Sequence, residues 1–232
     1  MTAATTGGTA GTEVGALAPT GFLDFDTAPV REFVARSVRA GGTPQQRAVD
    51  LYYAVRDGVR YEVYGADLSA TGLRASTVAR VRSGMCIHKS VLFAAGLRSM
   101  GVPARLVFAD VRNHLSSARL RELMGGDVFR HHCYTSVRLG GRWVKATPVF
   151  NRSLCRLFRI AELDFDGTGD SLHHPFDLDG RRHMEFLRVH GEFDDVPHRR
   201  VLADLRAGHA GLLDAEDRVV AGSLPAEARE RP

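Results

Sequence analysis

Cys86 is the residue of this chain whose type and surroundings best suit covalent chemistry. It lies where Ser83 leads into a nearly all-apolar run that ends at Pro103. This pattern predicts a central, buried helix that Ser83 caps, with Cys86 in its first turn. The partial positive charge of a helix N-terminus, together with Arg82 and Lys89 nearby, favours a thiolate. The alternative interpretation is a small buried residue without a chemical role.

A cysteine nucleophile needs an imidazole to take its proton, and His132 is the leading candidate. Residues 130–139 and 142–149 have the pattern of two strands, and Gly140-Gly141 between them suits a two-residue hairpin turn. In that register, alternation places the following residues on one face of the hairpin: His132, Tyr134, Ser136, Lys145 and Thr147.

The same register makes His132 and Thr147 diagonal neighbours, so that the threonine hydroxyl could orient the imidazole. His131 and Cys133 face the other side of the hairpin. His131 would become the base only if the pairing slipped by one residue. His88 lies two residues after Cys86 on the predicted helix and points elsewhere.

Composition excludes several classes of function. The 232 residues are 44% apolar and 25% charged, which is typical of a globular protein. The net charge of +4 comes from scattered arginines that do not alternate with aromatic residues, so we expect no nucleic-acid partner. No apolar run approaches the ~20 residues of a membrane span, so we expect no membrane partner.

The cysteines and the first residues bear on cofactors and location. Three widely spaced cysteines match neither a disulfide framework nor a zinc site, and we expect no metal and no cofactor. The first 20 residues lack the basic start and the apolar core of a signal peptide. Together these features predict a cytoplasmic location.

The predicted organisation is one domain at 21–207 between a flexible N-terminal tail at 1–20 and a polar C-terminal tail at 208–232. Thr43, Pro44 and Gln46 form a clear helix start, with a capping box and a proline in the first turn. Because helices come first and the hairpin follows, we expect an α+β fold. Further elements are predicted as helices at 29–40, 75–81 and 196–206 and a strand at 104–109.

Several segments resemble the transglutaminase-like superfamily. Residues 84–95 and 101–105 are similar to its cysteine helix and following strand, and residues 132–137 and 141–144 to its histidine strand and hairpin. A bacterial branch of the superfamily is similar at residues 110–115, 145–151 and 183–186, the last just before His190-Gly191. The resemblance covers roughly residues 45 to 200.

This resemblance implies a papain-like core, in which the cysteine helix packs on an antiparallel sheet that carries the histidine. It implies acyl transfer through a thioester on Cys86, with His132 as general base and then general acid, and no metal is needed. Thr147 stands where the superfamily usually has an aspartate. Asn151 and Asp110 are therefore alternatives to Thr147 for the third catalytic role.

A second departure concerns the substrate. Ser136 stands where relatives often carry an acidic residue, so Lys145 opposite lacks an ion-pair partner and could meet an anionic group. We group Lys145 with Tyr134 and Asp110 as the predicted substrate-binding residues. The backbone amide of Cys86 is the expected oxyanion donor, helped by a side chain from residues 61–69.

The expected activity is acyl transfer at an amide or thioester carbonyl, as amide-bond formation or hydrolysis. The expected partners are an acyl donor, either a peptide amide or an acyl thioester on a carrier protein in a biosynthetic pathway, and an amine or water as acceptor. Two alternatives stay open. One is a catalytically inactive binding module of the same fold, which Thr147 would favour, and the other is a cysteine peptidase or isopeptidase.

Overall fold

A computed structural model describes residues 14–114, 116–173 and 176–229. Its central element is α4 (Cys86–Ser99), in which every residue from Cys86 to Arg98 is buried. Three helices pack against it: α1 (Ala28–Ser37), α2 (Pro44–Gly58) and α3 (Ala75–Val81). The run of apolar residues on all sides of α4 explains this central position.

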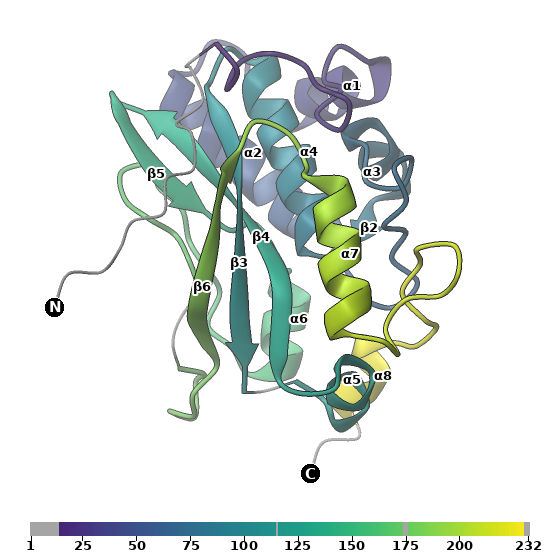
Figure 1. Cartoon of the computed structure of the whole chain (residues 1–232). Coiled ribbons are helices and arrows are strands. Elements are labelled where there is room, and N and C mark those ends of the chain that lie inside the picture. The colour runs from purple at the N-terminus through teal and green to yellow at the C-terminus, as the bar shows by residue number, and fades with distance from the viewer. Residues whose placement is uncertain (1–13, 115, 174–175, 230–232) are drawn as a thin grey trace, which may run out of the picture.

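The other side of α4 lies on a four-stranded antiparallel sheet of order β5-β4-β3-β6 (Figure 1). Its strands are β3 (Ala104–Asn113), β4 (Val128–Leu139), β5 (Arg142–Ala146) and β6 (Met184–Phe193). Helix α7 (His198–Gly208) contacts β4 (Figure 1). The predicted α+β fold, with the cysteine helix packed on an antiparallel sheet, is confirmed.

Shorter elements complete the fold. A two-stranded parallel sheet joins β1 (Arg60–Tyr61) to β2 (Ser83–Gly84). Three short helices are α5 (Ala118–Met124), α6 (Arg152–Phe158) and α8 (Leu224–Arg229). None of the described helices combines the length and the apolar character needed to cross a membrane.

The two predicted helix starts have different outcomes. At α2 the capping box is present, since Thr43 Oγ1 accepts from the Gln46 N–H and Gln46 Oε1 accepts from the Thr43 N–H. At α4 the predicted cap is wrong, because Ser83 belongs to β2 and pairs with Arg60. Pairing with β1 keeps this residue extended, so the helix begins at Cys86.

Both predicted tails are shorter than expected. Residues 1–13 lie outside the described residues, but Ala16 is fully buried and its carbonyl accepts from the Ala104 N–H. The polar C-terminal tail at 208–232 is wrong for much of its length. Leu212, Val219 and Leu224 are buried in the main core, and the Val219 N–H donates to the Ala66 carbonyl at 2.9 Å, so single apolar residues anchor this otherwise polar stretch.

Candidate active site

The site is built where β5 leaves β4. The predicted hairpin register is confirmed from Leu139–Arg142 to Thr135–Ala146, where the pairing ends. The Thr147 N–H then donates to the Ser171 carbonyl at 3.0 Å, and the next residue is a proline without an N–H. The predicted pairs of His132 with 149 and of Tyr134 with 147 therefore do not form.

The departure of β5 leaves the edge of β4 open at Cys133, and α4 occupies it. Ser90 Oγ donates to the Cys133 carbonyl at 2.9 Å, and the Cys133 N–H interacts with the sulfur of Cys86. Because Cys86 and Ser90 are one turn apart on α4, one helix face binds both backbone groups of Cys133. The Cys86 sulfur therefore lies beside the peptide bond that joins His132 to Cys133.

Burial controls the charge of Cys86. The side chain is 4% exposed, and desolvation raises its pKa to about 11 against the opposing effect of nearby backbone N–H groups. The two expected cations are engaged elsewhere. The Arg82 guanidinium lies over the Phe33 ring, and Lys89 Nζ donates to the carbonyls at the end of α2. The predicted lowering of the thiol pKa is therefore wrong.

His132 is buried among aromatic rings. Its ring centroid lies 6.4 Å from those of Tyr134 and His173 and 6.5 Å from that of Phe186. Burial, with a smaller contribution from His173, lowers the pKa of His132 to about 3. The imidazole is therefore neutral at pH 7, and its buried Nε2 has no hydrogen-bond partner among the described residues.

None of the three candidates for the third catalytic role binds His132 in this structure. Thr147 Oγ1 is buried and has no hydrogen-bond partner in the described part of the chain. Asn151 is committed to the scaffold, since Oδ1 accepts from the Tyr61 N–H and Nδ2 donates to the Val59 carbonyl at 2.8 Å. Asp110 Oδ1 accepts from the backbone N–H of His131 and from another imidazole on β6.

His131, the alternative base, has its own carboxylate. It adopts a left-handed φ of 55° at an irregularity of β4, and its Nε2 lies 2.7 Å from Asp204 Oδ2 on α7. Its ring stacks on His190 with centroids 4.4 Å apart, and His190 Nε2 contacts Asp110 at 2.8 Å. Its neighbour Phe108 belongs to the core under α4, so His131 and His132 face opposite sides of the sheet.

Two of the predicted substrate-binding residues have structural contacts. Tyr134 is 2% exposed and packs against Phe186, and Asp110 binds the two histidines just described. Lys145 differs from both. It pairs with Ser136 as predicted, is only half-buried, and forms no ion pair with any described residue.

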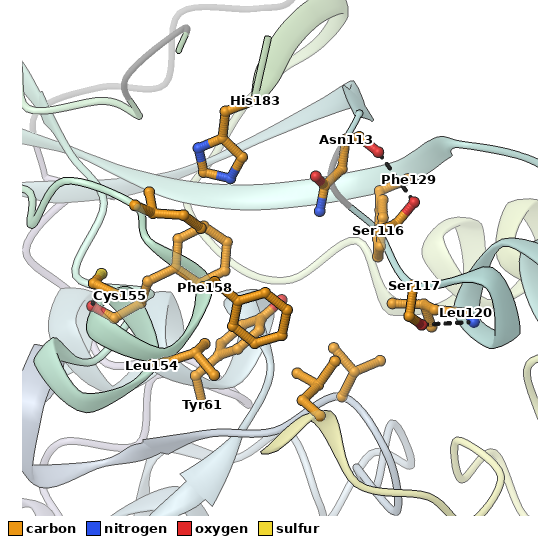
Figure 2. A pocket seen from close by; sticks show the side chains of 14 residues that line it. Tyr61, Asn113, Ser116, Ser117, Leu120, Phe129, Leu154, Cys155, Phe158 and His183 are labelled. Carbon is orange, nitrogen blue, oxygen red and sulfur yellow. Dashed lines mark hydrogen bonds between the residues drawn. The ribbon is translucent and has the colours of Figure 1, made fainter. Parts of the chain in front are cut away.

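A small apolar cavity of about 50 Å³ lies beside Tyr61 (Figure 2). Tyr61, which lines it, is also affected by Cys86, because a charge on the thiol adds to burial in raising the pKa of the phenol. The sequence-based prediction includes Tyr61 only as one end of the range 61–69, and it does not include the Cys133 N–H. The hairpin register does contain a signal for the latter, because it places Cys133 opposite Pro148, which cannot continue a strand ladder. Within the described residues, no three His, Cys, Asp or Glu side chains are arranged to hold a metal ion.

The solved structures that are similar to this chain include two candidate proteases. A candidate cysteine protease from Cytophaga hutchinsonii matches with a TM-score of 0.45 and 13% identity over 78% of this chain, which spans 54% of the other. A candidate protease from Parabacteroides distasonis ATCC 8503 matches with a TM-score of 0.36 and 13% identity over 55% of this chain and 26% of the other. The chain thus spans about half the first structure and a quarter of the second.

A comparison with curated proteins gives no match. The family model of the transglutaminase-like superfamily matches residues 31–148, which is just over half of the chain. The match includes the cysteine helix, the histidine strand and the whole hairpin. It supports cysteine-based catalysis in general, without separating acyl transfer from hydrolysis. By this match the chain belongs to the transglutaminase-like superfamily.

Proposed function

We propose that this protein is a cysteine acyltransferase or hydrolase that acts through a thioester on Cys86. The observation that carries the proposal is the position of the thiol. Cys86 is the first residue of the central helix, and its sulfur lies against the open edge of β4, beside the peptide of His132. The thiol thus lies beside the backbone of the strand that carries His132, among backbone N–H donors.

The proposed chemistry has two half-reactions. The Cys86 sulfur attacks the donor carbonyl while His132 takes the thiol proton. Burial keeps both groups neutral in the free protein, with a thiol pKa of about 11 and an imidazole pKa of about 3, so bound substrate must bring these two pKa values closer together before the proton moves. Collapse of the intermediate forms the thioester and expels an amine or thiol, which receives the proton from His132. An amine or water then attacks the thioester, and the same proton transfers run in reverse.

Backbone N–H groups are the proposed oxyanion donors. Cys86 is the first residue of α4, so its own N–H has no intrahelical partner. The N–H groups of Cys86, Ile87 and Cys133 all interact with the sulfur. They therefore surround the place where charge develops on an attacked carbonyl.

Thr147 is the proposed partner of the imidazole. A buried hydroxyl without a hydrogen bond costs about 1–3 kcal/mol, and Thr147 Oγ1 is in this position. Bonding to His132 would remove that cost and fix the ring. A hydroxyl cannot stabilise an imidazolium by charge, so this third group is weaker than an aspartate.

The proposed donor is an acyl thioester on a carrier protein in a biosynthetic pathway, with a peptide amide as the alternative. Lys145 supports the first, since its half-buried ammonium could bind the phosphate of a carrier arm. The second choice would make the protein a cysteine peptidase or isopeptidase. We place the protein in the cytoplasm, where its three free cysteines would stay reduced.

A second candidate is a binding module that keeps the fold without the chemistry. The raised pKa of Cys86 and the unbonded hydroxyl of Thr147 favour it. The two candidates differ in whether Cys86 can be acylated.

The test is intact-protein mass spectrometry after incubation with carrier-bound and small acyl thioesters. Wild type is compared with Cys86→Ala and with Cys133→Ala, which removes another buried thiol. An acyl adduct on wild type and on Cys133→Ala, absent from Cys86→Ala, supports the enzyme. No adduct with any donor contradicts it and leaves the binding module.

A further inference from the structure

Aromatic rings cover His132 on its face of the sheet. The ring centroid of Phe186 on β6 lies 6.5 Å from that of His132, and the centroid of His173 lies 6.4 Å from it. The two covering rings pack on each other with centroids 4.5 Å apart, and Tyr134 packs against Phe186 at 5.6 Å. Under this cover His132 is only 5% exposed and its Nε2 is buried. A reactant therefore reaches Nε2 only after part of the cover moves.

An open cavity of about 420 Å³ borders the other side of the same cover. Both His173 and Phe186 line it, together with apolar side chains that include Leu172, Phe176 and Met184. Its volume falls within the range of ~300–1,000 Å³ found for small-molecule sites. The cavity can therefore accommodate a phenyl ring that leaves its place over the imidazole.

Phe186 is the ring of this group that is best placed to move. Tyr134 is 2% exposed and pairs with Val107 in the middle of the sheet, so its ring is held on all sides. Phe186 is half-buried, lies on an edge strand and borders the cavity. The register of β3 and β6 also shifts between Asp110 and Val111, directly beside the pair of Val111 with Phe186. Such irregularities redirect side chains, and they are common beside active sites.

We propose that Phe186 is a gate over His132, which opens when its ring rotates into the neighbouring cavity. The proposal rests on the proposed function for the role of His132 as the base. Rotation about the Cα–Cβ bond from one staggered rotamer to another is sufficient for this movement, and no backbone segment has to be displaced. Because only the open form lets a reactant approach the imidazole, the position of this ring sets the fraction of reactive protein.

The experiment measures the rate at which diethyl pyrocarbonate modifies His132 at pH 7, where the imidazole is neutral. Peptide mass spectrometry locates the modified histidine. Phe186→Ala removes the gate. Leu187→Ala is the matched control, since Leu187 is the next residue of β6, is 42% exposed and does not line the cavity. Phe186→Leu is a second variant in case Phe186→Ala does not fold, which thermal unfolding checks.

His132 should react slowly in wild type and in Leu187→Ala. It should react about tenfold faster in Phe186→Ala, because burial of a phenylalanine ring favours the closed form by about this factor. His88 is 3% exposed and is the internal reference, which should stay slow in every chain. Equal rates at His132 in Phe186→Ala and Leu187→Ala, or rapid modification of His132 in wild type, would overturn the gate.

Acylation of Cys86 by a small acyl thioester separates the gate from the proposed function. If wild type is acylated, the rate should rise in Phe186→Ala and stay unchanged in Leu187→Ala. Acylation that is present but equal in all three chains overturns the gate while the proposed function stands. If no chain is acylated, faster modification of His132 in Phe186→Ala alone still supports the gate, although the proposed function fails.

Discussion

Because His132 is buried, the free energy of unfolding should fall on acidification, and replacing His132 should remove this contribution. The folded imidazole has a pKa of about 3 because it is desolvated, whereas in the unfolded chain it titrates near its ordinary value of 6.5. As the pH falls below 6.5, the unfolded chain binds a proton that the folded chain does not. Stability is therefore lost on acidification, down to about pH 3.

The size of the effect follows from these two values. At pH 7 the unfolded imidazole is mostly neutral, and the penalty is about 0.2 kcal/mol. At pH 5 the unfolded form lies 1.5 pH units below its pKa of 6.5, which corresponds to about 2 kcal/mol. Wild type should thus lose about 2 kcal/mol more than His132→Gln between pH 7 and pH 5.

The assay is urea unfolding at both pH values, followed by the fluorescence of Trp143, the single tryptophan of the chain. The other titrating groups are common to both proteins, so their contributions cancel in the comparison. A second measurement follows the ring resonances of His132 by NMR, which should stay unchanged from pH 8 to pH 4. Equal losses of stability in the two proteins, or a midpoint near 6.5 in the ring resonances, would refute the burial argument.

Three further outcomes are expected. The rate at which iodoacetamide alkylates Cys86 should keep rising up to pH 10, because burial raises the thiol pKa to about 11, and a plateau below pH 8.5 would contradict this. Asn151→Ala should lower the free energy of unfolding in urea by about 1–3 kcal/mol, because it leaves the Tyr61 N–H unpaired, and an unchanged midpoint would exclude that role. Ser90→Ala should lower the free energy of unfolding by about 1 kcal/mol, because it leaves the Cys133 carbonyl without its hydrogen bond. Ser90→Thr, which keeps a hydroxyl, should lower it less. Equal free energies of unfolding for the two variants would show that this hydrogen bond does not stabilise the fold.

Elements with strong local signals could be predicted from the sequence. The capping box at Thr43 and the Gly140-Gly141 turn fix α2 and the hairpin register through short-range geometry. The helix at Ala75–Val81 was predicted with the observed bounds. In each case the residues that decide the structure are neighbours in the sequence.

Strand β6 was missed because its pattern is weak. It lies at the edge of the sheet, where β3 is its one partner among the described strands, and Leu187 and Val189 on it are 42% and 56% exposed. Apolar residues exposed in this way do not give the alternation that identifies a strand. The cap of α4 failed for a related reason, since the pairing of Ser83 depends on β1, more than twenty residues earlier.

The charge state of the site was the least predictable property, and the reason is physical. Arg82 and Lys89 are close to Cys86 in the sequence, but the direction in which each side chain points decides whether its charge acts on the thiol. Lys89 points into the core and binds carbonyls of α2, so its charge serves the scaffold. Desolvation, which depends on everything packed around a group, then outweighs the helix N-terminus.

The early end of the hairpin is a third case. It brings together residues that are far apart in the sequence, but a short sequence pattern predicts it. A two-residue turn sets the register, the register places Cys133 opposite Pro148, and a proline cannot supply the N–H that the ladder needs. The strand must therefore open at Cys133. A helix with Cys86 and Ser90 one turn apart can bind both exposed backbone groups. The pairing of nucleophile and histidine strand thus follows from a hairpin that ends early, and replacing Pro148 with alanine should test it. In this variant β5 should extend along β4, and hydrogen exchange of the Cys133 amide would report the change. The rate of Cys86 acylation should then fall. A protected amide together with an unchanged acylation rate would show that the open edge does not position the thiol.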